Sequence, residues 1–418
     1  MAPTPWDIEH KWSVSPHCWD EGIRKNMPNL PKKVLVRDVT FREGDDCVGY
    51  NVSVKDKMEM LRFAVEEFGI KEIDVGGPSM HVHQYEFSKA VTNSGIKVSK
   101  TARFFANNTK DFKKDVDICV EAGCDNFRIV LMYLNERTLL EQLAAFPKMV
   151  DYIHSQYKKQ VLFGMSDVTR GPMQLIRKVF TEGTAAGADK AGIFDTFGVA
   201  TPNVMKLLAT TVRSIIRPEM SLMVHCHNTF GLATANTLAA VEGGANETDV
   251  VINGYGDEAG NASLEEVVAS LEALYGVDTG LKLELLNKYS KMAIEKGKIP
   301  IQPHKAIVGE NAFLRPMYIW AGIDMAKESW MLHEPLSSEA VGTHSTVVFG
   351  PEGSTDDAPI EKKLQELGIP YTPADIVLVR DTVAKEIEKE YPVMARKKYL
   401  SEAEFEDLLR KLVGSKKK

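Results

Sequence analysis

The chain of 418 residues lacks the features that mark several large classes of protein. No apolar run approaches the roughly 20 residues that cross a bilayer, so we expect no membrane partner. The first 29 residues carry charges, prolines and three tryptophans, and they lack the apolar core of a secretory signal. Because the net charge is -7, the chain also lacks the positive field typical of nucleic-acid binding, and we expect no nucleic-acid partner.

Cysteine is also scarce. The cysteines form no Cys-x-x-Cys pair and no even framework of the kind found in disulfide-rich secreted domains. We therefore expect a cytoplasmic protein in a reducing compartment. The hydrophobic share of 44% and the charged share of 26% are those of a soluble globular protein. The five cysteines are Cys18, Cys47, Cys119, Cys124 and Cys226.

From Lys33 onward, short β-rich runs alternate with longer amphipathic segments. This alternation predicts an α/β fold with a parallel sheet, and eight such units in about 250 residues match a (β/α)8 TIM barrel. A doubly wound open sheet is the competing fold, but no Gly-x-Gly-x-x-Gly follows the first strand. The expected strands are Val34–Val39, Ile70–Val75, Val98–Phe105, Phe127–Leu131, Gln160–Met165, Lys190–Asp195, Ser221–Cys226 and Thr248–Asn253.

After about Gly280 the alternation stops, and we expect a smaller, mainly helical C-terminal region with little strand. Ser401 and Glu404 have the spacing of a capping box at the start of its last helix. Residues 342–358, rich in Gly, Ser, Thr and Asp, indicate a loop. The expected division is an N-terminal extension (1–32), the catalytic barrel (33–280), a linker or subdomain covering the active site (281–345) and a helical subdomain (346–418).

Polar and charged side chains follow most of the expected strands. Active sites of such barrels are built at the C-terminal ends of the strands, so these side chains are expected to meet at one mouth. They are Arg42, Glu43, Asp74, Asp167, Arg170, Asp195, Thr196, His225, His227 and Asn261.

His225 and His227 end the seventh strand and, at i and i+2, point to the same face. Two ordinary surface histidines would be the simpler explanation if the pair stood alone. With Glu43 at the same mouth they form a ligand set for one divalent cation, and Asn261 offers a weaker fourth ligand. Carboxylate and imidazole ligands suit Zn, Mn, Co or Mg. A 2-oxo acid chelated by this cation would have its carbonyl polarised, and Arg42 could stabilise the resulting oxyanion; a surface ion pair with Glu43 is the alternative for Arg42.

Several segments carry a resemblance to a known family. Val36–Gly44 resembles the opening motif of the isopropylmalate synthase and homocitrate synthase family, the metal-dependent barrel group that also includes hydroxymethylglutaryl-CoA lyase. His225–Asn236 and Asn253–Glu266 are similar to its His-x-His-Asn signature and its glycine loop. Asp195–Pro202 and Ile307–Phe313 are similar to further family blocks, so the likeness spans roughly residues 33–313.

The resemblance implies a Claisen-type condensation. An acyl-CoA, usually acetyl-CoA, loses a methyl proton, the enolate attacks the ketone of a 2-oxo acid, and thioester hydrolysis releases CoA and a 2-hydroxy diacid or triacid. It implies Glu43, His225 and His227 as metal ligands with Asn261 near the metal, and Arg42 in the oxyanion role. It also implies that Thr196 contacts the carboxylate of the oxo acid.

The chain departs from the family at the positions that handle the proton. The family's glutamate in the second strand is Asp74, the glutamate after the fifth strand is Ser166, and the synthases' Gly-Ile-His is Gly322-Ile323-Asp324. Asp324 and Asp167, with His333 and Tyr318, are the candidates for the missing base, although a packed or solvated residue is the simpler explanation for each.

Cationic groups near strands two to four would suit a second carboxylate on the oxo acid. They are His81, His83, Arg103 and Arg128, and the histidines could instead belong to an ordinary loop. Three functions compete: an acyl-CoA:2-oxo-acid condensing transferase, a carbon–carbon lyase on the same scaffold, and a binding protein that keeps the metal site. We expect a homodimer, as is usual for the family.

Overall fold

The computed structural model describes residues 4–107, 111–316, 335–349, 357–388 and 399–416. The chain divides into two compact units. The first is formed by Met1–Asp7, Val14–Ile301 and Ala306–Val308, and the second by Ile8–Ser13, Gln302–Lys305 and Gly309–Lys418. Among the described residues, no helix is long and apolar enough to cross a membrane.

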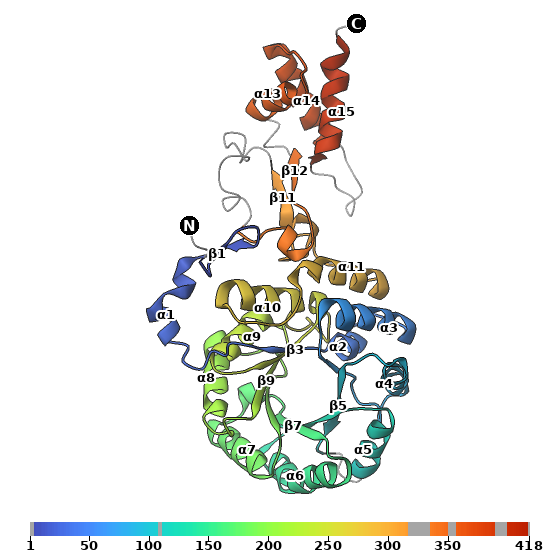
Figure 1. The fold of residues 1–418 in the computed structure, drawn as a ribbon, viewed down its shortest axis with the longest axis vertical. Helices are drawn as coiled ribbons and strands as arrows, with labels where there is room; N and C mark the ends of the chain where they lie inside the picture. Colours follow the sequence, from blue (N-terminus) through green and yellow to red (C-terminus); the bar gives the residue numbers. More distant parts are fainter. Residues whose placement is uncertain (1–3, 108–110, 317–334, 350–356, 389–398, 417–418) are drawn as a thin grey trace. The chain divides into compact units, whose positions relative to one another are not determined.

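Eight parallel strands of the first unit close into a barrel (Figure 1), which confirms the predicted TIM barrel and excludes the open sheet. The chain order of the strands is their order around the barrel, and β10 closes it by pairing with β3. The strands are β3 (Leu35–Asp38), β4 (Glu72–Asp74), β5 (Ser99–Phe105), β6 (Asn126–Leu131), β7 (Gln160–Met165), β8 (Lys190–Asp195), β9 (Ser221–Cys226) and β10 (Glu247–Val250).

Helices follow each strand and surround the barrel in Figure 1. Their starts are marked by local signals: the Ser53 side chain accepts a hydrogen bond from the Asp56 amide, and Pro202 opens another helix at a position where its missing N–H costs nothing. The helices are α2 (Thr40–Asp46), α3 (Val54–Arg62, continued to Phe68), α4 (Val82–Ser94), α5 (Phe112–Glu121), α6 (Glu136–Tyr157), α7 (Met173–Ala185), α8 (Pro202–Arg213), α9 (Ala233–Glu242), α10 (Leu264–Ser270, continued to Tyr275) and α11 (Leu286–Gly297).

The last barrel strand is shorter than predicted. The sequence suggested a strand from Thr248 to Asn253, but β10 ends at Val250 and Ile252–Gly254 form a 3-10 turn. Asn253 lies in the left-handed region with φ 61°, a conformation that asparagine tolerates better than most residues. The turn leads the chain into the glycine loop at the barrel mouth.

Charged side chains fill much of the barrel interior toward the N-terminal ends of the strands. The guanidinium of Arg37 is fully buried, and its Nη2 atom lies 3.0 Å from Glu72 Oε1 and 2.7 Å from Glu247 Oε2. Its Nη1 atom lies 2.9 Å from Asp249 Oδ1. Lys190 bridges the same two glutamates, at 3.4 Å from Glu72 and 3.0 Å from Glu247. Because buried charges are tolerated only when paired, the network ties together four strands, β3, β4, β8 and β10.

Short elements precede the barrel. Residues 14–32 belong to the first unit, where Arg24 Nη1 donates to the Tyr275 carbonyl over 2.8 Å. The short elements before the barrel are β1 (Asp7–Ile8), β2 (Trp12–Ser13), the 3-10 helix Pro16–Trp19 and α1 (Glu21–Lys25).

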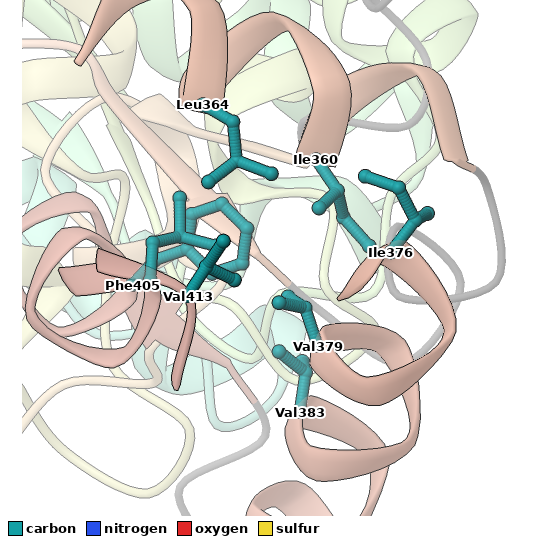
Figure 2. Packing of buried hydrophobic residues seen from close by; sticks show 8 residues of the cluster. Ile360, Leu364, Ile376, Val379, Val383, Phe405 and Val413 are labelled. Atoms are coloured by element: carbon teal, nitrogen blue, oxygen red, sulfur yellow. The ribbon is translucent and has the colours of Figure 1, made fainter. Parts of the chain in front are cut away.

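The second unit has its own core. Its helices α13 (Asp357–Glu366), α14 (Pro373–Glu388) and α15 (Glu402–Leu412) were predicted, as was the capping box of Ser401 and Glu404. Figure 2 shows their apolar side chains turned toward one another. The buried cluster is Ile360, Leu364, Ile376, Val379, Val383, Phe405, Leu409 and Val413.

The second unit also contains a small sheet that composition did not predict. β12 (Thr346–Phe349) pairs in parallel with β11 (Leu314–Pro316) and antiparallel with β13 (Leu400–Ser401). β12 lies inside the stretch expected as a loop. Its Thr-Val-Val-Phe sequence favours a strand, and the surrounding Gly and Ser residues had masked that preference.

The buried network makes Arg37 a test of barrel stability. We expect Arg37→Met to lower the free energy of unfolding of the barrel by about 3–5 kcal/mol, because three carboxylates lose their shared partner. Arg62→Met is the matched control, since Arg62 forms an exposed i,i+4 pair with Glu66 that is worth about 0–1 kcal/mol. Calorimetry of both variants would check this, and equal melting temperatures would contradict it.

Candidate metal centre and substrate cavity

A cavity of about 280 Å³ opens at the C-terminal ends of the barrel strands. All of its lining residues belong to the first unit. Its walls combine charged groups with apolar side chains from several strands, which is the composition expected of a small-molecule site. The lining residues are Arg42, Glu43, Asp46, Arg103, Phe105, Arg128, Val130, Met132, Ser166, Phe194, Thr196, Phe197, His225, His227, Asp257 and Glu258.

Three of these residues form a compact cluster of metal-binding groups. Glu43 lies in the first turns of α2, directly after β3, while His225 lies near the end of β9 and His227 just beyond it. His225 Nε2 is 3.2 Å from Glu43 Oε1 and 3.2 Å from His227 Nε2. One ligand atom from each residue lies within 4.8 Å of the other two, close enough to share one cation.

Two buried groups at the cluster lack the partners that buried oxygens require. Glu43 Oε2 accepts no hydrogen bond within the described residues, while Oε1 lies beside Arg42 and His225. The amide oxygen of Asn261 is also without a donor there, while its nitrogen is 3.3 Å from His225 Nε2. Such orphaned oxygens are rare in native proteins. Two imidazole nitrogens with two oxygens therefore fit a divalent cation such as Zn, Mn, Co or Mg.

The surroundings of Glu43 and His227 favour the protonation states in which each side chain can bind a metal ion. Burial would raise the pKa of Glu43, but Arg42 and His225 outweigh it and hold that pKa well below its usual range. Burial and the neighbouring His225 lower the pKa of His227 to about 4. At neutral pH Glu43 is thus a carboxylate and His227 a neutral imidazole. Burial lowers the pKa of His225 as well, but the adjacent carboxylates of Asp249 and Glu43 more than compensate and raise it.

Arg42 lies buried beside this cluster and lines the cavity. It contacts Glu43, and its side chain approaches Asp74 and Asp46 at 3.8 Å each. Burial disfavours its charge, but these carboxylates prevail and raise its pKa above the ordinary value. A permanently charged guanidinium therefore lines the cavity beside the cluster of Glu43, His225 and His227.

Thr196 lines the cavity as expected, whereas the predicted acids Asp167 and Asp74 do not. The Thr196 hydroxyl accepts a hydrogen bond of 2.7 Å from the Asp167 amide. Both carboxylate oxygens of Asp167 are bound by Arg170, at 2.6 to 2.9 Å, and this side chain lies outside the lining. Asp74 is also outside the lining, buried with one oxygen 3.2 Å from Arg128 Nη1.

The predicted cationic groups take different positions. Arg103 lines the cavity with its guanidinium 5.0 Å from the Phe105 ring centroid, and burial together with Arg42 lowers its pKa to about 10. Arg128 also lines it, but its guanidinium is held by carboxylates on both sides. His81 is exposed before α4, with its ring 5.8 Å from that of His83, and it does not line the cavity.

Asp324, the candidate at the altered Gly-Ile-His position, lies outside the described residues. The structure adds acids at the cavity that the sequence did not single out as site residues, namely Asp46, Asp257 and Glu258. Asp249, behind His225, was also missed. The available signal was the alternation of Glu247 and Asp249 in a barrel strand, which places both side chains in the interior.

Comparison with known proteins identifies the family. A family model described as HMGL-like matches residues 33–293, which is more than half of the chain. The chain belongs to the HMGL-like family. The matched region covers the eight barrel strands and every candidate metal ligand.

Similar proteins support this family assignment. A probable 2-isopropylmalate synthase from Ignicoccus hospitalis is 33% identical and covers 87% of this chain and 91% of its own length. The homocitrate synthase AksA of Methanopyrus kandleri is 30% identical, covering 84% of this chain and 86% of its own. The solved hydroxymethylglutaryl-CoA lyase of Pseudomonas aeruginosa has a TM-score of 0.53 and 22% identity, over 64% of this chain and 94% of its own, and so shows the shared HMGL-like fold alone.

His227 provides a direct test of the candidate metal site. We expect His227→Ala to lose both tightly bound metal and turnover, because one of two nitrogen ligands disappears from a cluster of three groups. Metal analysis of the purified variant, with activity measured alongside, would check this. Wild-type turnover in a metal-free His227→Ala protein would contradict the ligand assignment.

Gly256 tests the position of Asn261. A Cβ atom at Gly256 would lie 1.9 Å from Asn261 Oδ1, and Gly256 itself does not adopt a positive φ. We therefore expect Gly256→Ala to keep the backbone but to turn the Asn261 side chain away and weaken metal binding by roughly 10–100-fold. Titration of the metal-free protein with Zn²⁺ would measure this, with Asn261→Ala as reference. Unchanged affinity in both variants would remove Asn261 from the site.

Proposed function

We propose that this protein is a metal-dependent acyltransferase that condenses an acyl-CoA, most simply acetyl-CoA, with a 2-oxo acid. The products would be CoA and a 2-hydroxy di- or tricarboxylic acid. The observation that carries this proposal is the cluster of Glu43, His225 and His227 in the wall of a cavity that also contains Arg42. Such a cavity can bind an oxo acid and polarise its carbonyl, and the family is one whose reaction requires that step.

Glu43, His225, His227 and Asn261 would hold the cation, which when bound supplies Lewis-acid polarisation of a carbonyl. Arg42 would donate hydrogen bonds to the oxyanion that develops as the carbon–carbon bond forms. Its charge is already set in place by neighbouring carboxylates, so little reorganisation is needed at the moment of reaction. Thr196, which also lines the cavity, would hold the substrate carboxylate.

Removal of the methyl proton from the acyl-CoA requires a base. Asp324 and Asp167 were the sequence candidates, and the pairing of Asp167 with Arg170 makes it less free to act. Asp46 joins them, because it lines the cavity and because burial and Glu43 raise its pKa. A carboxylate with a raised pKa is a stronger proton acceptor than an ordinary one.

The remainder of the oxo acid would face Arg103, with Arg128, Asp74 and His81 as the further substrate-binding candidates. Of these, Arg103 is best placed, because it lines the cavity and no ion pair within the described residues occupies it. An oxo acid with a second carboxylate would supply the missing anion.

The relatives favour the transferase over the lyase. Synthases of isopropylmalate and homocitrate match this chain at 30% identity or more, over most of its length. The lyases are similar in fold alone. We also propose that the protein is a homodimer and that it lies in the cytoplasm.

The proposal is tested by incubating the metal-loaded protein with acetyl-CoA and a panel of 2-oxo acids, and following the release of free CoA thiol. We expect release that depends on one oxo acid and disappears in Arg42→Ala, which loses the oxyanion donor. Cleavage of a hydroxy acid or its CoA ester to a ketone, without condensation, would establish the lyase. Silence in both directions with tight metal binding would indicate a binding protein.

A further inference from the structure

Asp249 contacts the metal cluster from behind. It lies in β10 and is 1% exposed, so no solvent reaches its carboxylate. Its Oδ2 atom is 3.0 Å from His225 Nδ1, while the other ring nitrogen, Nε2, faces Glu43 and His227. The imidazole of His225 is therefore held between a carboxylate on one side and the metal-binding groups on the other.

This contact decides which nitrogen of His225 carries hydrogen. A carboxylate only accepts hydrogen bonds, so Nδ1 must donate to it. The lone pair of a neutral imidazole is then on Nε2, the atom that faces the cluster. The negative charge of Asp249 also makes that lone pair a stronger donor to a cation.

The carboxylate of Asp249 is held in this orientation by two arginines. Arg37 Nη1 holds its Oδ1 at 2.9 Å, and Arg128 Nη2 lies 3.1 Å from Oδ1 and 2.8 Å from Oδ2. Arg128 is fixed in turn by Asp74 at 3.2 Å. Two buried arginines thus orient one carboxylate, which orients one ligand.

We propose that Asp249 is a positioning residue of the metal site, and that Arg37 and Arg128 hold it in place. It sets His225 to bind through Nε2 and keeps the ring at the angle that Glu43 and His227 require. The inference rests on the proposed metal site, but it does not depend on which reaction that site performs.

Asp249→Asn is the test variant. The amide group can donate to Nδ1, which favours the tautomer with hydrogen on Nε2 and blocks that ligand atom. We expect Zn²⁺ affinity, measured by calorimetric titration of metal-free protein, to fall by about 10–100-fold. Equal affinity of wild type and variant would overturn the proposal.

Glu247→Gln is the matched control. Glu247 lies in the same strand, is buried, and shares Arg37 with Asp249, but it pairs with Arg37 and Lys190 rather than with His225. Both variants should lower the melting temperature, and only Asp249→Asn should weaken Zn²⁺ by more than threefold. An equal loss of affinity in both would show a general effect of the charge network and overturn the specific role.

A measurement on the wild-type protein covers the case in which the variant does not fold. Nitrogen-15 NMR of histidine in the Zn²⁺-loaded protein distinguishes the two ring nitrogens, and we expect His225 to carry hydrogen on Nδ1. Ligation through Nδ1 would overturn the proposal, as would failure of the wild type to bind Zn²⁺. Failure of the condensation assay with normal metal binding would sink the proposed function and leave this inference standing.

Discussion

The pairing of buried charges inside the barrel is the constraint on which both the fold and the site depend. Arg37 pairs with three buried carboxylates inside the barrel. One of them, Asp249, also contacts His225, which faces the barrel mouth. Removing one of these groups unbalances the buried charges that remain, which costs stability. The network links the barrel strands to the position of His225, so forming the barrel also brings the candidate metal ligands together.

The metal-binding cluster contains buried oxygens that lack hydrogen-bond partners. Glu43 and Asn261 keep buried oxygens without hydrogen bonds in the described part of the chain, directly beside a well-paired network. Local violations of this kind are typical of functional positions, where a ligand supplies what the protein lacks. Gly256 belongs to the same arrangement, since any side chain there would occupy the place of Asn261 Oδ1.

The proton-handling groups distinguish this chain from the synthases that it resembles. Ser166 stands at the cavity where the resemblance leads one to expect a glutamate, while Asp46, Asp257 and Glu258 add carboxylates elsewhere on the lining. The candidate metal ligands and Arg42 are thus all present at the cavity, while the expected glutamate is replaced by a serine. Arg103 lines the same cavity.

The sequence alone was sufficient for the barrel, since strand and helix periods depend on local patterns of apolar residues, and the eight predicted strands all form. It also indicated Glu43, His225 and His227 together, because barrel topology brings strand ends to one mouth. Tertiary structure decided what depends on distance between remote residues: the pairing of Asp249 with His225, and the enclosure of Arg128 by the carboxylates of Asp74 and Asp249. Those contacts join side chains from different strands, and no spacing within one strand specifies which partner a buried charge will meet.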